Sequence, residues 1–462
     1  MRVLFYNWDP IDGPAGGGVT GYLKELFRSA LTSYPKLEIW FLNSGRSYDE
    51  KDESYIRKRK NIFGKRIHAY EVVNSPVLAP GRQSPVNVSV YLEDRVLENI
   101  IGDFIEENGV FDVVHFHNTE GISLGVLKLK EKFPKTKWLL TLHNYYPFCP
   151  QVNLWSHGER NCAGDDPSDC VGCFVTENMD LARFRFAHLD IPELKNIFYN
   201  YSATHPDKAE AKHYEQYRKE TLFVMNSCFD EVLCVSKRTK EVAERAGIRK
   251  NILRLSYAGS AVAGRQRGYK GNGNTEALHI IYLGYAFKEK GFDFFLRAVD
   301  SIPKKMAEKL FVTVVARANE ETCRRAEEIL NIPGRYEGSI YLNGYEDEDE
   351  LEKILSAQDL GIIPVLWEDN LPRVAMEQFA AGIPLLTSDL GGAKELGGDN
   401  PDFVFRAGDI EDFIEKLRNI MEHRELLGKY FEQAIKLKTM DEHLKELMEI
   451  YEGETIMPIE IS

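Results

Sequence analysis

The 462-residue chain lacks a run of about 18 apolar residues, the length that a membrane-spanning helix needs. Its first residues, Met1 to Trp8, are too short for the apolar core of a secretory signal peptide. A secreted disulfide framework is also unexpected, because the cysteines number seven, which is odd. These absences together predict a cytoplasmic protein.

An excess of positive charge is absent as well. Lys and Arg number 58 against 72 Asp and Glu, a formal net charge of -14. A nucleic-acid-binding protein needs a basic face to neutralise phosphates, so nucleic acid is not an expected partner. The one dense basic run, Arg57 to Arg66, holds six cations in ten residues, with Ile62 and Phe63 among them. Two interpretations stay open: a solvated loop, or a peripheral contact with the inner membrane face in which Phe63 inserts beside the cations.

The complete dinucleotide pattern Gly-x-Gly-x-x-Gly, with an acid about twenty residues later, is missing too, which disfavours a dehydrogenase. A long glycine loop containing Gly17 and Gly18 instead joins a strand at Val3 to Tyr6 to a helix from Val19 to Leu31. Glycines that open a helix expose N–H groups to an anion. The loop is therefore either a phosphate-binding element or simply a tight connection.

Short apolar runs alternate with helical patterns in both halves of the chain, which is typical of parallel α/β sheets. A polar, glycine-rich segment at 264–274 separates the halves. We predict two Rossmann-like domains at 1–262 and 275–435, followed by a helical segment at 436–462. A Cys-rich helical insert at about 145–218 interrupts the first domain. Glu231 to Ser236 is expected to be the strand that closes the first sheet.

The most informative stretch runs from Trp367 to Glu395. Asp369 and Asn370 are good N-cap residues and Pro372 suits the first helical position, so a helix should begin there. The N–H groups at its start can hold a phosphate, and Glu377, one turn inside, can accept hydrogen bonds from a pair of hydroxyls. A sugar nucleotide offers both groups.

This stretch resembles the retaining family-4 glycosyltransferases (glycosyl transferases group 1). In that family two acids separated by seven residues precede Gly-x-Pro and Gly-Gly-x-x-Glu, and Asp369, Glu377, Gly382 to Pro384 and Gly391 to Glu395 fit the pattern. The resemblance implies a GT-B fold, with two Rossmann-like domains facing a cleft and the last helix packing back on the first domain. It assigns the donor sugar to Asp369 and the ribose to Glu377. The first acid is normally Glu, and Glu368 is a rival one residue out of register.

A second element, Leu283 to Gly291, resembles the family's Gly-Arg…Lys-Gly clamp for the donor diphosphate. Lys290 matches, but Tyr285 occupies the Arg position, so Arg317 or Arg373 would have to supply the second charge. The resemblance thus implies a donor-binding set of Gly17, Gly18, Gly284, Lys290, Arg317, Asp369, Asn370, Leu371, Pro372, Arg373 and Glu377.

Three histidines, His115, His117 and His143, follow predicted strands, and ligands of doubly wound sheets bind beyond the carboxyl ends of strands. A lone histidine is more often a satisfied core or loop residue. The resemblance singles out His143, which lies beside the donor sugar in matching enzymes. The implied catalytic residues are His143, Asp369 and Lys290.

Four cysteines, Cys149, Cys162, Cys170 and Cys173, crowd into one segment. Four thiolates can form a tetrahedral zinc shell, and we treat a structural zinc as one interpretation. Unlinked thiols in an ordered insert, or a redox-sensitive cluster, are the others.

The expected activity is retaining transfer of a sugar from a UDP- or GDP-sugar to a hydroxyl of a sugar or lipid-linked acceptor, in surface polysaccharide or glycolipid synthesis. No cofactor is expected for the chemistry, because family members lack an Asp-x-Asp metal motif. A nucleotide-sugar epimerase or a sugar phosphorylase of the same fold would use the same cleft. A non-catalytic scaffold that binds a nucleotide sugar is a further alternative, which Tyr285 keeps open.

Overall fold

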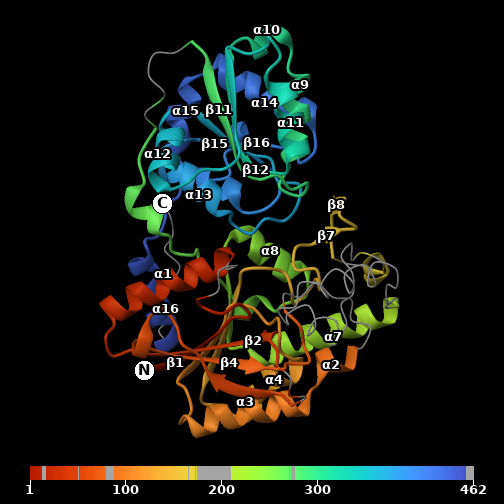
Figure 1. Ribbon diagram of the computed structural model, residues 1–462, viewed down its shortest axis with the longest axis vertical. Coiled ribbons are helices and arrows are strands. Elements are labelled where there is room, and N and C mark those ends of the chain that lie inside the picture. The colour runs from red at the N-terminus through yellow and green to blue at the C-terminus, as the bar shows by residue number, and fades with distance from the viewer. Residues whose placement is uncertain are drawn as a thin grey trace.

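The computed structural model describes residues 1–12, 17–49, 51, 53–79, 88–164, 166–171, 173, 210–269, 271 and 276–453. Two α/β units lie one above the other in Figure 1. The first is built around an eight-stranded sheet and the second around a six-stranded sheet. In both units, helices connect successive strands along the chain, as the alternation in the sequence predicts.

The first sheet is parallel except at one edge, where β3 and β4 are antiparallel. Its central strand β1 is almost fully buried from Val3 to Tyr6, because helices cover both faces of a parallel sheet. The strands, in spatial order, are β10 (Leu253–Leu255), β9 (Glu231–Cys234), β6 (Lys137–Leu142), β5 (Val113–Phe116), β1 (Arg2–Tyr6), β2 (Glu38–Ser47), β4 (Ile67–Val73) and β3 (Tyr55–Lys58). The helices are α1 (Gly18–Ser33), α2 (Val88–Leu92), α3 (Arg95–Glu107), α4 (Leu124–Lys128), α7 (Ala211–Cys228) and α8 (Lys237–Arg245).

The second sheet pairs all its neighbouring strands in parallel. In spatial order the strands are β13 (Gly338–Leu342), β12 (Leu310–Arg317), β11 (Leu278–Tyr285), β14 (Leu360–Ile363), β15 (Leu385–Ser388) and β16 (Val404–Phe405). Its helices are α9 (Phe292–Ser301), α10 (Lys304–Ala307), α11 (Glu320–Leu330), α12 (Glu348–Ser356), α13 (Arg373–Ala380), α14 (Ile410–Glu422) and α15 (Glu425–Lys429). A continuous core of Phe, Leu and Val side chains joins the sheet to these helices.

The last helix, α16 (Met440–Glu452), returns to the first unit and lies beside α1 in Figure 1. Its residues Leu444, Leu447 and Tyr451 share one hydrophobic cluster with Phe5 and Leu23. The Lys137 Nζ donates a hydrogen bond to the Ile450 carbonyl oxygen at 2.5 Å. The segment after the second sheet therefore contributes to the first core, whereas the domain limits at 262 and 275 stay a prediction.

Two expectations about the first sheet are wrong. The strand at Glu231 does not close the sheet, because β10 pairs outside it. The basic run is not all loop, since Tyr55–Lys58 forms the edge strand β3. Both missed strands are three or four residues long, too short to show a period of two.

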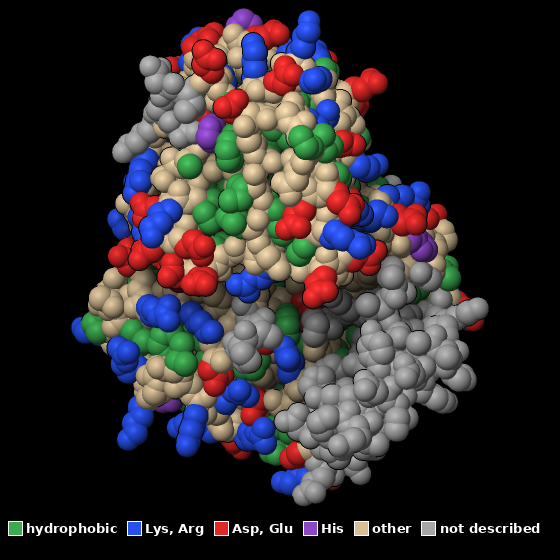
Figure 2. All heavy atoms as spheres, turned by 45° about the horizontal axis from the view of Figure 1, so that its top comes forward, with side chains coloured by type: hydrophobic (Ala, Val, Ile, Leu, Met, Phe, Trp, Pro, Cys, Tyr) green, Lys and Arg blue, Asp and Glu red, His purple; other side chains and the backbone are tan. Residues whose placement is uncertain are grey.

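Part of the predicted insert, residues 174–209, lies outside the described residues. Its described part contains the small hairpin of β7 (Trp155–Ser156) and β8 (Arg160–Asn161). Among the helices that the structure describes, none is long and apolar enough to span a membrane. The face of the molecule in Figure 2 carries acidic and basic side chains side by side.

Candidate functional site

A cavity of about 610 Å³ is lined by residues of both units. This volume is in the usual range for a small-molecule site. The first unit contributes Gly18 from α1 and His143 from the end of β6; the second contributes Gly284 from β11 and the segment from Asp369 to Glu377. The carboxyl ends of parallel strands thus meet at the cavity, where ligands of such sheets bind.

The helix α13 begins within one residue of the predicted position, but its cap differs. Pro372 is the N-cap, and no side chain caps the first turn. Asp369 and Asn370, expected as caps, have other partners: Asp369 Oδ2 accepts from Lys290 Nζ at 2.6 Å, and Asn370 Nδ2 donates to the His143 carbonyl oxygen at 2.5 Å. The N-terminal end of α13 is therefore not capped by a side chain where it meets the cavity.

The glycines of the Gly-Gly-x-x-Glu pattern shape the loop that carries Asp369. Gly391 has φ of +71°, and a Cβ there would lie 2.3 Å from the Asp369 carbonyl oxygen. A Cβ on Gly392 would lie 2.1 Å from the Asn370 carbonyl oxygen, and its N–H donates to the Asp369 carbonyl at 2.8 Å. Only glycine allows this approach, so the two glycines support the cavity wall although they are not part of its lining.

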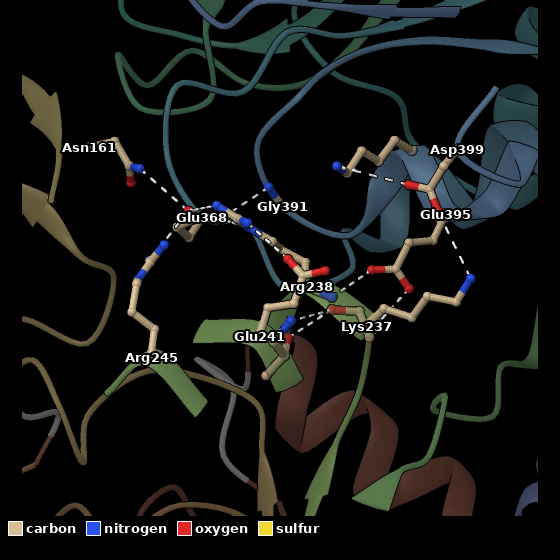
Figure 3. Close-up of polar contacts among 12 residues, drawn as sticks. Asn161, Lys237, Arg238, Glu241, Arg245, Glu368, Gly391, Glu395 and Asp399 are labelled. Atoms are coloured by element: carbon tan, nitrogen blue, oxygen red, sulfur yellow. Dashed lines mark hydrogen bonds and ion pairs between the residues drawn. The ribbon is translucent and has the colours of Figure 1, made fainter. Parts of the chain in front are cut away.

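The structure separates Asp369 from its rival Glu368. Asp369 lines the cavity, whereas Glu368 is completely buried between the units. Arg238 donates to Glu368 through Nε at 2.8 Å and through Nη2 at 2.5 Å, as Figure 3 shows. Burial acts to raise the pKa of Glu368, but the hydrogen bonds and charge of Arg238 lower it overall. Glu368 is thus a charged partner of Arg238, and Asp369 is the acid available to a ligand.

Lys290 is brought beside Asp369 by a tight turn. A Cβ on Gly291, which has φ of +76°, would lie 1.8 Å from the Pro364 carbonyl oxygen at the end of β14. The turn therefore packs directly against the strand that leads to Asp369. The Lys290 ammonium also lies 4.9 Å from the centroid of the Trp367 ring, within range of a cation–π contact.

Glu377 lies one turn inside α13 and lines the cavity. Its Oε2 atom is buried and has no hydrogen-bond partner among the described residues. Burial raises the pKa of Glu377, although the positive charge of Arg373 opposes this shift. A buried carboxylate oxygen without a donor is a strong acceptor for the hydroxyl groups of a ligand.

The two candidates for the second cation of the predicted clamp lie in different places. Arg373 lines it and forms an ion pair with Glu25 of α1 at 3.3 Å. Arg317 lies outside the lining, and its Nη2 donates to the Tyr345 carbonyl oxygen at 3.3 Å. Tyr285, in the position of the family's Arg, also lines the cavity, and the residue is 59% exposed. Of the two arginines, only Arg373 is at the cavity in the described part of the chain, and the roles of Arg373 and Arg317 in donor binding stay predictions.

Of the glycine loop, residues 13–16 lie outside the described part of the chain. Gly18 lines the cavity, whereas Gly17 precedes α1 outside the lining. Sequence reasoning missed Gly21, one turn further on. A Cβ at Gly21 would lie 2.7 Å from Arg373 Nη1, so this glycine gives the Arg373 side chain room to pass α1.

The three histidines have different environments. His143 lines the cavity, and the Nε2 atom of His143 lies 3.0 Å from Nδ1 of His117. His115 is a core residue whose ring nitrogens bond to Tyr451 Oη at 2.7 Å and Thr141 Oγ1 at 2.8 Å. Burial lowers the pKa of all three, that of His143 to about 3. All three rings are consequently neutral near pH 7.

Glu395, the last residue of the pattern, binds the first unit. Its carboxylate accepts from the Lys237 and Arg238 N–H groups, both at 2.8 Å, at the N-terminus of α8. Tyr257 Oη donates to it at 2.7 Å. Figure 3 shows this carboxylate beside the Glu368–Arg238 pair, so two carboxylates of the second unit bind one helix start of the first. These contacts fix the two walls of the cavity relative to each other.

The four cysteines are unpaired thiols, and two of them accept hydrogen bonds from nitrogen. Cys173 Sγ accepts from Gln151 Nε2 at 2.8 Å, and Cys170 Sγ accepts from Arg218 at 3.0 Å. Burial raises the pKa of Cys149 to about 12. Within the described ranges, which include all four cysteines, no group of three or more His, Cys, Asp or Glu residues is placed to hold a metal ion. The arrangement does not fit a zinc shell, and the zinc at Cys149, Cys162, Cys170 and Cys173 stays a prediction for metal analysis.

Two Rossmann-like units that face a shared cavity define the GT-B class of fold. The chain is similar to HepE of Anabaena in complex with UDP, with a TM-score of 0.58 and 13% identity over 98% of this chain and 100% of that one. The same protein with UDP and glucose gives 0.56, with 12% identity over 98% and 100%. Sucrose-phosphate synthase of Thermosynechococcus elongatus gives 0.57, with 13% identity over 98% of both chains. At these identities the likeness shows the fold alone.

Residues 270–437 match the family described as Glycosyl transferases group 1, so the second unit carries a domain of this group. Sulfoquinovosyl transferase SQD2 of Arabidopsis thaliana is 24% identical over 177 residues, 34% of this chain and 30% of the relative. Spore coat protein SA of Bacillus subtilis is 22% identical over 158 residues, 33% of this chain and 42% of the relative. The match thus spans less than half the length of either relative.

Proposed function

We propose that the protein is a retaining glycosyltransferase of the family-4 type, which transfers a sugar from a nucleoside diphosphate sugar in the cavity to a hydroxyl acceptor. The observation that carries the proposal is Glu377 Oε2, a buried acceptor at the cavity that has no donor among the residues the structure describes. Adjacent ribose hydroxyls supply two O–H donors to such a carboxylate. Support also comes from HepE, a GT-B neighbour solved with UDP and glucose.

In this proposal the ribose binds Glu377 and the diphosphate lies at the uncapped start of α13. Helix N–H groups and the positive end of the helix dipole favour the phosphates there. Lys290 has three N–H donors, so it can retain Asp369 while it donates to a phosphate oxygen. Arg373 supplies the second charge. The sugar then extends toward Asp369 and His143.

The transfer step breaks the bond from the anomeric carbon to the diphosphate oxygen and forms one to the acceptor oxygen. We propose attack from the face that the diphosphate leaves, with the acceptor proton passing to a diphosphate oxygen. Two of the carboxylates that line the cavity are already paired with cations, Glu25 with Arg373 and Asp369 with Lys290. Lys290, Arg373 and the α13 amides stabilise the charge on the leaving group, so the residues present provide this stabilisation themselves.

A panel of UDP-, GDP- and ADP-sugars tests the proposal, first by thermal shift and then by product analysis. A bound donor raises the melting temperature of the folded protein. Release of nucleoside diphosphate with a glycosylated acceptor supports a transferase. Formation of a sugar phosphate only when free phosphate is present indicates a phosphorylase. Recovery of an epimerised donor indicates an epimerase, and binding without turnover indicates a scaffold.

For the acceptor we propose a lipid-linked sugar at an anionic membrane face, and the structure reduces the predicted contact surface. Arg57 and Arg59 are paired with Glu71, both at 2.7 Å, and Phe63 is buried. The docking surface is therefore redefined as Lys58, Lys60, Ile62, Lys65 and Arg66. Ile62 is 56% exposed, and the four cations form no ion pair in the part of the chain that the structure describes.

Liposome sedimentation tests this surface. Each cation near an anionic surface contributes about 1 kcal/mol, so binding should require anionic lipid and weaken with salt. Changing the four cations to Gln should abolish pelleting, whereas Lys304→Gln with Lys305→Gln in the second unit should not. Equal pelleting with neutral vesicles, or none, would favour a soluble acceptor.

A further inference from the structure

A column of aromatic rings lies behind the cavity wall at His143. The His117 ring centroid is 5.3 Å from that of His143, with an interplanar angle of 26°. On its other sides His117 packs against His115 at 4.3 Å, Tyr22 at 5.6 Å and Phe5 at 5.9 Å. His117 is fully buried, and its backbone N–H donates a hydrogen bond to the Tyr6 carbonyl oxygen at 2.9 Å. The ring therefore has one fixed position.

The ring nitrogens of His117 have unequal partners. Its Nδ1 lies 3.0 Å from His143 Nε2, whereas its Nε2 is buried without a partner among the described residues. A buried N–H without an acceptor is rarer, and costs more free energy, than a buried unprotonated ring nitrogen without a donor. The proton of the neutral ring therefore belongs on Nδ1, from which it is donated to His143 Nε2.

That donation determines the form of His143. Its Nε2 must be bare in order to accept, and a neutral ring carries one proton, so the proton of His143 is on Nδ1. Since His117 occupies Nε2, Nδ1 is the ring nitrogen available to a ligand in the cavity. His143 then acts toward that ligand as an N–H donor.

We propose that His117 is a positioning residue, which holds His143 in the Nδ1–H tautomer so that His143 donates a hydrogen bond to an oxygen of the donor sugar. This assignment rests on the proposed function for the identity of the ligand. The tautomer itself follows from the protein alone. A hydroxyl that must donate to His143 would be rejected, which makes the pair a determinant of specificity.

The column is anchored from behind by the last helix. His115, stacked on His117, bonds to Tyr451 of α16, and Tyr22 Oη bonds to His443 Nε2 of the same helix at 2.7 Å. On that side Glu446 forms an ion pair with Lys438 and lies 3.9 Å from His443 Nδ1. Burial lowers the pKa of His443, so the group that contacts Tyr22 is a neutral ring.

Nuclear magnetic resonance of protein labelled with 15N-histidine tests the tautomer without any ligand. Long-range proton–nitrogen spectra distinguish protonated from bare ring nitrogens, and the signal absent from His143→Gln assigns His143. We expect a protonated Nδ1 and a bare Nε2. A wild-type His143 that is protonated on Nε2 would overturn the inference.

Two variants separate the hydrogen bond from the packing. His117→Phe keeps an aromatic ring without nitrogens, and His117→Asn retains an N–H donor close to the place of Nδ1. We expect the Phe variant to give His143 a mixture of tautomers and the Asn variant to restore one. His115→Asn, in the same column, should leave His143 unchanged; an equal effect of all three variants would reduce His117 to a packing role.

The same variants are then titrated with UDP-glucose and with UDP. His117→Phe should weaken UDP-glucose by about three- to tenfold, the value of one hydrogen bond, while UDP stays within about twofold. Equal loss for both probes would contradict positioning of the sugar. If wild-type protein binds neither probe, UDP-glucose is not its donor, and the tautomer result still decides the role of His117.

Discussion

Glu368 and Glu377 are both largely enclosed by protein, yet their partners differ. Glu368 has the Arg238 guanidinium, whereas Glu377 Oε2 has no partner in the described part of the chain. A buried carboxylate oxygen without a donor lowers stability, and such groups persist in proteins where a ligand completes them. At the scale of single residues, this contrast distinguishes a structural acid from a binding acid.

Glu377→Gln should weaken nucleotide binding and stabilise the free protein. Loss of hydrogen bonds to a charged group costs about 1.5 to 3 kcal/mol, or one to two decades in affinity. Because burial raises the pKa of Glu377, ionisation of this carboxyl lowers the stability of the folded protein, and the neutral amide should raise the melting temperature at pH values above the folded-state pKa. Calorimetry and thermal unfolding measure the two effects.

The pH dependence gives a second check on Glu377. A raised pKa contributes stability at low pH that is lost as pH rises through the folded-state value, so the gain from Gln should shrink on acidification. Nucleotide affinity of the wild type should also fall as this carboxylate protonates. Glu411→Gln, at an exposed position in α14, serves as the control and should change neither property.

Substitution of Glu368 should lower stability and leave donor affinity little changed, whereas substitution of Asp369 should do the reverse. Removing one partner of a buried ion pair costs about 3 to 5 kcal/mol, so Glu368→Gln should unfold at lower denaturant concentration with donor affinity little changed. Asp369→Asn should unfold near the wild type but bind the donor sugar more weakly. Loss of ligand binding in Glu368→Gln alone, at temperatures where it is folded, would reverse the assignment.

Lys290 should contribute most to diphosphate binding. Lys290→Ala should lower affinity for a nucleoside diphosphate by about one to two decades, and affinity for the nucleoside much less. Arg373→Ala should lower affinity less than Lys290→Ala, because Glu25 already neutralises part of the Arg373 charge. Arg317→Ala, outside the cavity lining, is the matched control. Normal diphosphate affinity in Lys290→Ala would place the phosphates elsewhere.

At the scale of elements, α8 is unusual because the other unit binds its N-terminus. The Glu395 carboxylate accepts from two N–H groups of its first turn, while Ser236 caps it locally. A helix start bound across a domain boundary ties the position of one element to another. The cavity width therefore depends on this contact.

Glu395→Ala should loosen the boundary between the units. Loss of such a cap costs about 0.5 to 2 kcal/mol of stability, and donor affinity should also fall because the cavity walls are less fixed. Asp347→Ala removes the N-cap side chain of α12, which lies within the second unit alone. It should lower stability without changing affinity. Equal affinities for the two variants would show that the Glu395 contact is only structural.

The sequence predicted the elements whose patterns are long and apolar. The strand expected at Val3 to Tyr6 is observed as β1 (Arg2–Tyr6), because a strand buried on both faces gives an uninterrupted apolar run. The helix expected from Val19 to Leu31 is observed as α1 (Gly18–Ser33), because its apolar residues recur at helical spacing. The strands β3, β10 and β16 were not predicted, because two to four residues are too few to show the two-residue alternation of a strand. Tertiary pairing, not local pattern, makes them strands.

At the scale of the whole molecule, the cavity was predictable where its residues are contiguous. Asp369, Arg373 and Glu377 lie on one loop and helix, so spacing alone placed them together. Contacts between the units were not predictable: Glu395 with α8, or Gly21 beneath Arg373, depend on how two folded units meet. Even the choice between Arg317 and Arg373 required that arrangement.

The central claim is that this cavity transfers sugar from a nucleotide donor with retention. Proton magnetic resonance during turnover of the donor selected by thermal shift tests it most directly, because the anomeric coupling of the first product reports its configuration. The account predicts nucleoside diphosphate release and a product that keeps the anomeric configuration of the donor, with both lost in Lys290→Ala. An inverted product, or no release from any UDP-, GDP- or ADP-sugar that binds, would contradict it.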